Sequence, residues 1–229
     1  VRAAVVEARR LGLQVAAHAI STDSIRIAAE AGVDTIEHCS WIGSDPKTTV
    51  TDETAVAFMV KNGVRVDHAI IPRPYQFADE GAGKPTPEEE WWFRMLKIRW
   101  PFLHRMREKG VTVFLGTDAG YGPWPGTGKW PGAQEMARAV EVMVRHGGFS
   151  PAEAIALATR EAARAIRLDG EIGSVERGKR ADLILLRGDP LKDIRALREV
   201  AMVFRDGRLV ARDGHIVLPG SEGEAGGAR

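Results

Sequence analysis

Three side chains of kinds that bind metal ions lie at the ends of short apolar runs. His18 and His38 each stand six residues after a glycine that precedes such a run, and Asp118 ends a similar run within the stretch GTDAG. Side chains at the carboxyl ends of neighbouring parallel strands meet at one edge of a sheet, so we expect these three to converge. Two imidazoles and one carboxylate form a ligand set that suits zinc or a similar divalent cation.

Each of these residues also fits a purely structural role. A histidine after an apolar strand is often a buried core residue, and an aspartate before a turn often caps that turn. The shared spacing of His18 and His38 favours a metal site over two independent structural roles. His68 lies one position out of this register, which turns a strand side chain to the opposite face, so we predict that it is not a ligand.

Two residues flank His38 in the same run. Adjacent residues of a strand face opposite ways, so Glu37 and Cys39 are expected to point away from the site. Cys39 is further expected to be buried and inert.

Substrate contacts are expected from the loops that follow the strands. Arg73 and Tyr75 come after the third apolar run, and Tyr121 comes after Asp118. A guanidinium binds a substrate carboxylate through two parallel hydrogen bonds, and loops at the carboxyl ends of strands often shape a binding site. All three residues also fit ordinary positions in a surface loop.

A helix-like stretch that ends in glycine and continues into an apolar run occurs four times. Glycine directly after a helix is a usual C-terminal cap, because it enters the left-handed region without steric cost. The pairs are Gly12 with LQVAAHA, Gly32 with VDTIEHCS, Gly63 with VRVDHAII and Gly110 with VTVFLGTDAG. Helices are predicted at 21–31, 51–62, 88–109, 133–147 and 151–166. Pro101 is expected to kink or split the third of these.

This alternation of strands and helices predicts an α/β fold with a parallel sheet. Four strand–helix units are half of a (β/α)8 barrel of the TIM type, and an open sheet of four strands would leave two unpaired edges. We therefore expect a partial barrel over residues 1–167, with the beginning of the barrel missing. A chain that opens on Val1 rather than Met agrees with that expectation.

The pattern changes after residue 167. Residues 168–218 alternate apolar and polar side chains by twos and carry Asp-Gly pairs at 206–207 and 213–214, which predicts antiparallel strands joined by hairpins. The segment 219–229, PGSEGEAGGAR, is predicted to be a disordered tail.

Composition excludes several classes of protein. With 32 Lys and Arg against 31 Asp and Glu, the net charge of +1 offers no basic field for nucleic acid. A single cysteine rules out an internal disulfide framework and a multi-cysteine zinc site. No apolar run is long enough to span a membrane, and no signal-peptide pattern opens the chain. We expect a cytoplasmic protein that acts on a small molecule or a peptide; a homo-oligomer is left open.

Four segments together resemble the amidohydrolase superfamily, in particular its imidazolonepropionase-like and prolidase-like members. They are VAAHAISTDSIRIAAEAGVDTIEHCS, FLGTDAG, SPAEAIALATREAARAI and GEIGSVERGKRADLILLRGDPL, and the similarity extends over about residues 5–210. The resemblance implies that residues 1–167 contain strands 5–8 of a metal-dependent barrel. It also implies that residues 168–218 supply C-terminal strands of a small composite β-sandwich.

The resemblance assigns roles to the three candidate ligands. His18 and His38 match the metal-binding histidines of barrel strands 5 and 6, and Asp118 matches the strand-8 aspartate that binds metal and accepts the proton of the attacking water. One or two ions of zinc or another divalent metal would activate that water to cleave a carbon–nitrogen bond in an amide, cyclic amide or peptide. The family's strand-1 HxH pair is absent, and no lysine stands at a suitable strand end. We therefore expect negligible catalysis from this chain alone.

Two alternatives remain open beside a carbon–nitrogen hydrolase. The chain fits a non-catalytic remnant, or a subunit that needs a complementary chain. It also fits a mononuclear deaminase of the same superfamily, because the strand-4 position that would distinguish one metal from two lies outside the sequence.

Overall fold

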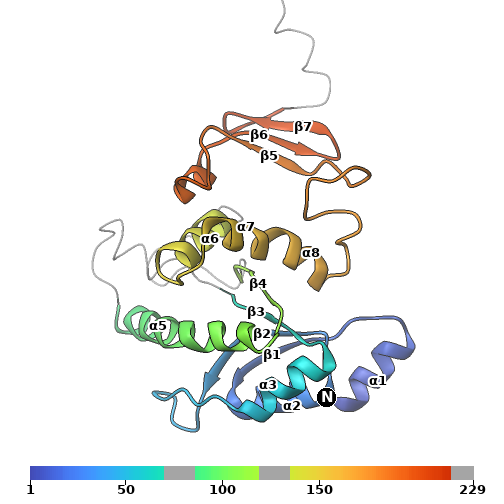
Figure 1. Cartoon of the computed structure of the whole chain (residues 1–229), viewed down its shortest axis with the longest axis vertical. Helices are drawn as coiled ribbons and strands as arrows, with labels where there is room; N and C mark the ends of the chain where they lie inside the picture. The colour runs from blue at the N-terminus through green and yellow to red at the C-terminus, as the bar shows by residue number, and fades with distance from the viewer. Residues whose placement is uncertain (70–85, 119–134, 218–229) are drawn as a thin grey trace, which may run out of the picture.

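A four-stranded parallel sheet forms the first part of the molecule. The computed structural model describes residues 1–69, 86–118 and 135–217. The sheet contains β1 (Ala16–Ser21), β2 (Thr35–Ile42), β3 (Arg65–Asp67) and β4 (Val113–Phe114), in the spatial order β1-β2-β3-β4 (Figure 1). Strands that follow one another in the chain are therefore neighbours in space, and the predicted α/β fold with a parallel sheet is confirmed.

The helices between these strands begin and end close to the predicted positions. They are α2 (Thr22–Ala31), α3 (Glu53–Asn62) and α5 (Pro87–Glu108), and a further helix, α1 (Arg2–Arg10), precedes β1. Gly32 after α2 and Gly63 after α3 have φ of 72° and 67°, the left-handed conformation expected of a glycine cap. Helices α2 and α3 pack side by side against the sheet, where Ile25, Ile36 and Met59 are at most 1% exposed (Figure 1).

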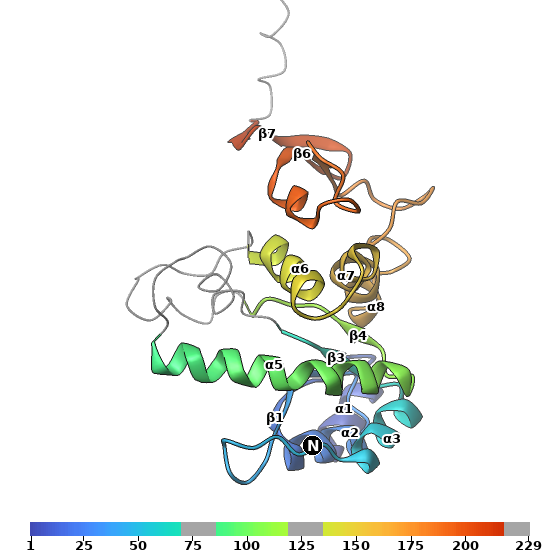
Figure 2. The same cartoon turned by 60° about the vertical axis from the view of Figure 1, so that its left-hand side comes forward.

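Helix α5 corrects one prediction, because it runs through Pro101 without a break. The helix spans 22 residues with Pro101 inside it, and Figure 2 shows it as one continuous rod beside the sheet. Proline lacks the N–H that would bond to the carbonyl of Lys97. Trp100 and Leu103, on either side of the proline, are 7% and 1% exposed, so burial of this face holds the helix together.

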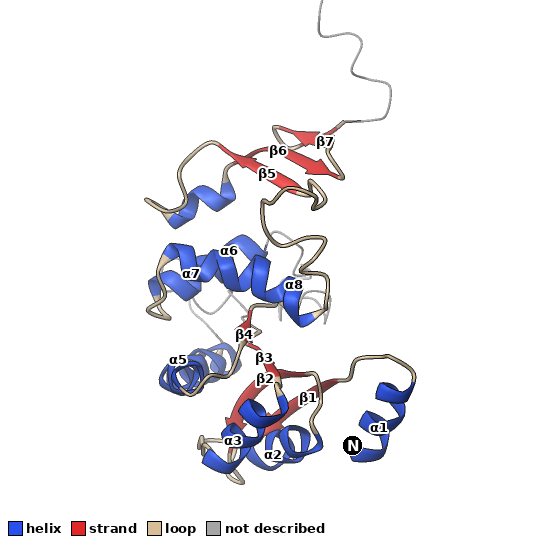
Figure 3. Cartoon of the chain, turned by 45° about the vertical axis from the view of Figure 1, so that its right-hand side comes forward, coloured by secondary structure: helices blue, strands red, loops and turns tan. Residues whose placement is uncertain are grey.

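A second group of helices lies between the parallel sheet and the C-terminal part of the chain (Figures 1 and 3). It consists of α6 (Glu135–Arg145), α7 (Pro151–Ala156), the π-helical turn η1 (Leu157–Glu161) and α8 (Ala162–Ala165). Helix α7 begins with the capping box predicted from Ser-Pro-Ala-Glu: the Ser150 side chain accepts from the Glu153 amide, and the Glu153 side chain accepts from the Ser150 amide. In the part of the chain that the structure describes, no helix is long and apolar enough to cross a membrane.

The C-terminal part is a separate antiparallel sheet. Its strands are β5 (Leu183–Leu186), β6 (Val200–Arg205), β7 (Arg208–Arg212) and β8 (His215–Ile216), with a 3-10 helix η2 (Ile194–Arg198) before β6. Both predicted Asp-Gly pairs form hairpin turns: Asp206, Gly207, Asp213 and Gly214 all have positive φ. The predicted tail at 219–229 lies outside the described residues.

The capping box of α7 leads to a prediction about pH. Hydrogen bonds from the Ser150 hydroxyl and amide, together with the Arg107 guanidinium, lower the pKa of Glu153 from 4.5 to about 2. A carboxyl group whose pKa is lower in the folded state stabilises the fold above its unfolded pKa, and this contribution is lost as the pH falls towards the folded pKa. In urea unfolding, we expect Glu153→Gln to be less stable than wild type at pH 7, and the difference to shrink from pH 4.5 towards pH 2. A difference that does not change with pH would contradict the assigned role of the carboxylate.

Candidate functional site

His18 and His38 lie in contact on the neighbouring strands β1 and β2. Neither residue ends its strand as predicted, because β1 continues to Ser21 and β2 to Ile42. The ring centroids of the two histidines are 4.6 Å apart, with 70° between the ring planes. Two imidazoles that bind one zinc ion through bonds of about 2.0–2.1 Å have centroids about 5 Å apart, so this spacing is compatible with a shared ion. His18 is exposed, whereas His38 is half-buried. Their role as metal ligands stays a prediction.

The backbone of β2 departs from regular strand geometry where it carries His38. His38, Cys39 and Trp41 have φ of 67°, 47° and 56°, a conformation that side chains other than glycine seldom adopt. Between the pairs Ala19↔His38 and Ser21↔Ile42, β2 therefore has two more residues than β1. Such a bulge re-aims the side chains that it contains.

This irregularity corrects the prediction that Glu37 points away from the site. Glu37 is the register partner of His18, and partners in adjacent parallel strands face the same side of a sheet. Strict alternation would then turn His38 away from His18, but the positive φ of His38 brings the two rings together. Cys39 is 2% exposed and its burial raises the pKa of its thiol to about 12, so the expectation of a buried, inert cysteine is confirmed.

Asp118 lies close enough to His38 to act on its charge. Burial lowers the pKa of His38, and the Asp118 carboxylate opposes that effect, while His18 and Arg99 add to it. A neutral imidazole is the form that binds a metal ion. Among the described residues, however, no three His, Cys, Asp or Glu side chains converge closely enough to hold an ion. His18 and His38 therefore fit a metal site in residue type and spacing. Asp118 does not lie close enough to both of them to complete a site of three ligands.

A buried carboxyl pair adjoins the histidines and was missed by the sequence analysis. Asp67, on β3, is 8% exposed and hydrogen-bonds to its register partner Glu37, which in turn accepts from the Thr35 hydroxyl at 2.6 Å. Burial, followed by the nearby Glu37 carboxylate, raises the pKa of Asp67 well above its ordinary value. The Gly116 amide donates to Asp67 Oδ1 at 2.7 Å. The available signal was an acidic residue inside the apolar run VRVDHAII.

Arg99 of α5 binds the irregular backbone of β2 at His38. Its guanidinium donates to the carbonyl of His38 and lies 3.2 Å from Nδ1 of His68. His68 is 2% exposed, packs 5.0 Å from the Trp100 ring, and has a pKa held well below its ordinary value by burial and by Arg99. His68 therefore contributes to packing beneath the site, in line with its prediction as a non-ligand.

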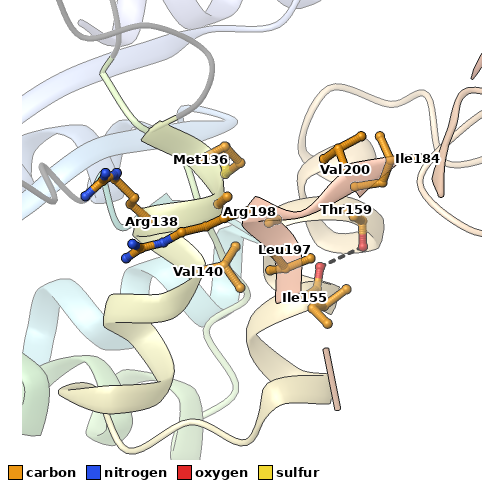
Figure 4. Close-up of a pocket in the computed structure, with 11 residues that line it drawn as sticks. Met136, Arg138, Val140, Ile155, Thr159, Ile184, Leu197, Arg198 and Val200 are labelled. Carbon is orange, nitrogen blue, oxygen red and sulfur yellow. Dashed lines mark hydrogen bonds between the residues drawn. The ribbon is translucent and has the colours of Figure 1, made fainter. Parts of the chain in front are cut away.

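The candidate substrate-contacting residues Arg73, Tyr75 and Tyr121 lie outside the described residues. A cleft of about 460 Å³ lies elsewhere, between α6, the α7–η1 helix and the C-terminal sheet (Figure 4). Met136, Val140, Leu197 and other apolar side chains line it, and none of its lining residues comes from β1–β4. This cleft is thus separate from the histidine pair.

Comparison with known proteins decides the family. Residues 1–210 match the amidohydrolase family. The chain belongs to the amidohydrolase family. It is therefore a member of an enzyme family, and the resemblance inferred from its sequence segments is confirmed.

Individual relatives of this amidohydrolase span several activities. Imidazolonepropionase of Symbiobacterium thermophilum is 34% identical over 127 residues, which covers 54% of this chain and 28% of the relative. A 5-methylthioadenosine/S-adenosylhomocysteine deaminase of the same species is 35% identical over 124 residues, or 48% and 28% of the two chains. The crystal structure of a Xaa-Pro dipeptidase with methionine bound in its active site matches with a TM-score of 0.68 and 29% identity, over 91% of this chain and 47% of the dipeptidase. The amidohydrolase chain thus spans less than half the length of these relatives.

The close approach of Gly116 to Asp67 leads to a prediction about stability. A Cβ added at Gly116 would lie 2.5 Å and 3.0 Å from the two carboxylate oxygens of Asp67, and neither the buried carboxyl group nor the strand end can move freely. We expect Gly116→Ala to lower the free energy of unfolding by about 1–3 kcal/mol, measured with urea. Gly170→Ala is the matched control, because nothing lies within 4 Å of its added Cβ. Equal stability of the two variants would contradict the contact.

Proposed function

We propose that this amidohydrolase is a metal-dependent hydrolase of carbon–nitrogen bonds in amides, cyclic amides or peptides. The contact of His18 with His38 on adjacent parallel strands, in a chain of this family, is the observation that carries the proposal. The corresponding architecture is a partial (β/α)8 barrel, strands 5–8 with their helices, over residues 1–167. Residues 168–218 then belong to a composite β-sandwich, followed by a tail at 219–229.

The proposed metal ligands are His18, His38 and Asp118. The neutral form of His38 and the contact of the two rings support zinc or another divalent ion at this place. When bound, one or two such ions supply Lewis-acid activation of water and of the substrate carbonyl.

Within this proposal, Asp118 accepts the proton of the attacking water and passes it to the leaving nitrogen. A carboxylate beside the attacking water can act first as the general base and then as the general acid. Asp118 is exposed in the segment that follows β4, where a substrate can reach it. Arg73, Tyr75 and Tyr121 are proposed to contact the substrate, a small molecule or a peptide, with Arg73 binding a carboxylate.

Metal binding by the two histidines is the first prediction of this function. In Co²⁺ titrations followed by visible absorption, we expect His18→Ala and His38→Ala each to weaken binding by at least about tenfold, or ~1.4 kcal/mol. His215→Ala is the matched control, because His215 is an exposed histidine on β8. If the His18 and His38 variants bind Co²⁺ as well as the His215 variant does, the two histidines do not form the metal site.

Assays of residues 1–229 test whether this chain is active by itself, and any product that forms distinguishes the proposed hydrolase from a deaminase. The similarity to a 5-methylthioadenosine/S-adenosylhomocysteine deaminase favours the deaminase as the second candidate. With zinc present, we expect residues 1–229 to show negligible turnover of N-acyl amino acids, lactams and adenosine, because the chain contains no HxH pair. Turnover near that of full-length relatives would contradict this expectation. Release of ammonia from adenosine, without cleavage of N-acyl amino acids, would replace the hydrolase by the deaminase.

A further inference from the structure

We infer that Asp67 is a positioning residue for Asp118: its carboxyl group fixes the Gly116 amide and thereby the backbone that presents Asp118. The inference rests on the proposed role of Asp118 and adds a residue outside the set of His18, His38 and Asp118. Three observations carry it: a hydrogen bond, a close approach of Gly116 to Asp67, and a second anchor on the opposite edge of the strand.

The hydrogen bond from the Gly116 amide to Asp67 replaces a backbone hydrogen bond that regular pairing of the two strands would have made. Regular pairing of β3 with β4 ends at Asp67 and Phe114, and the last backbone bond between them runs from the His68 amide to the Phe114 carbonyl. The next amide of β4 that points towards β3 belongs to Gly116. It donates to the Asp67 carboxyl group at 2.7 Å instead of to a backbone carbonyl. The side chain of Asp67 therefore adds a hydrogen bond between β3 and the segment after β4, closer to Asp118 than the last backbone bond.

The approach of Gly116 to Asp67 is so close that a larger residue at position 116 would force the carboxyl group to move. A Cβ at Gly116 would lie 2.5 Å from Asp67 Oδ2, so the chain runs directly over the carboxyl group. This contact fixes the distance between the backbone at Gly116 and the side chain of Asp67 on β3. Asp118 follows two residues later.

The opposite edge of β4 is anchored as well. The Leu115 amide donates to the carbonyl of Leu157 at 3.2 Å, and Leu157 is the first residue of the π-helical turn η1. Successive amides of a strand point to opposite edges, so Leu115 and Gly116 are held from two sides. Asp118 then adopts φ of 53°, an uncommon conformation that persists only where the surroundings determine it.

Asp67 is itself held in place by β2. It hydrogen-bonds to Glu37, which is also the register partner of His18, and Thr35 donates to Glu37. One line of hydrogen-bonded polar groups therefore connects β2, the strand of His38, with the segment that leads to Asp118. Removal of Asp67 would interrupt this line between β2 and β4.

Two substitutions separate positioning from general support of the fold. Asp67→Asn retains an oxygen that accepts from Gly116 and gains an amide group that donates to Glu37, so both contacts persist. Asp67→Ala removes both. Val66→Ala is the matched control: Val66 is fully buried in the same strand, and its side chain faces the opposite side of the sheet.

The first measurement follows backbone amides by ¹H–¹⁵N NMR of the whole chain without metal. We expect Asp67→Ala to shift the Gly116 and Asp118 amide resonances more than any others outside residues 65–69, with Asp67→Asn and Val66→Ala leaving Asp118 near its wild-type position. Unchanged Gly116 and Asp118 resonances in Asp67→Ala would overturn the inference. This readout does not depend on the proposed metal site.

The second measurement is a double-mutant cycle on Co²⁺ affinity. Asp67→Ala is expected to weaken binding by about tenfold in the wild-type background, the size typical of residues that orient metal ligands, and to have no further effect in Asp118→Ala. Asp67→Asn should restore wild-type affinity. An equal loss in both backgrounds would show that Asp67 supports the fold generally and would overturn the positioning role. If the wild-type chain binds no Co²⁺, the proposed metal site fails, and the NMR measurement alone decides whether Asp67 positions Asp118.

Discussion

The parallel pairing of β1 with β2 is the constraint on which the candidate site depends. It places His18 and His38 on neighbouring strands, and the positive φ of His38, where the bulge of β2 begins, turns its ring towards His18. Regular pairing alone would place Glu37 beside His18, as the register shows, and would turn His38 to the other face. The site therefore requires both an ordinary sheet and a local departure from it. Arg99 holds that departure by donating to the His38 carbonyl.

Several buried polar groups beneath the site bond to one another, although Nε2 of His68 has no hydrogen-bond partner among the described residues. An unpaired buried carboxylate or guanidinium would cost several kcal/mol, so such groups persist only with partners. Asp67 has Glu37 and the Gly116 amide, and Arg99 has the His38 carbonyl and the His68 ring. Each of these contacts joins two different elements, which ties the short strands β3 and β4 to β2 and α5. Strands of three and two residues could not hold a fixed position by backbone pairing alone.

A similar contact joins the helices to the C-terminal sheet. Glu141 of α6 is 3% exposed and pairs with Arg145 of the same helix and with Arg198 of η2. Two guanidinium groups around one buried carboxylate compensate the loss of its hydration. Beside this contact lies the apolar cleft of Figure 4, with Arg198 among its lining residues. The C-terminal sheet is thus attached through charge pairing as well as through apolar packing.

The sequence by itself determined the features that depend on neighbouring residues in the chain. Glycine caps at Gly32 and Gly63, the capping box of Ser150 and the Asp-Gly hairpins were predictable, because their conformations follow from local sterics and hydrogen bonds. The repeat of helix, glycine and apolar run likewise predicted the parallel sheet, and the characteristic segments predicted the family.

Only the tertiary structure decided the features that depend on distant contacts. Pro101 stays within a continuous helix because its neighbours are buried, although local chemistry predicts a kink or a break. Glu37 shares a face with His18 because the two are register partners, and the positive φ of His38 turns its ring towards His18, which no rule of period two can reveal. Asp67 meets Gly116 across 49 residues of chain, and the limited space for a larger side chain there comes from a carboxyl group on another strand. The periodicity of a sequence indicates which way the side chains of a regular helix or strand point. The contacts named here depend instead on how distant segments pack together.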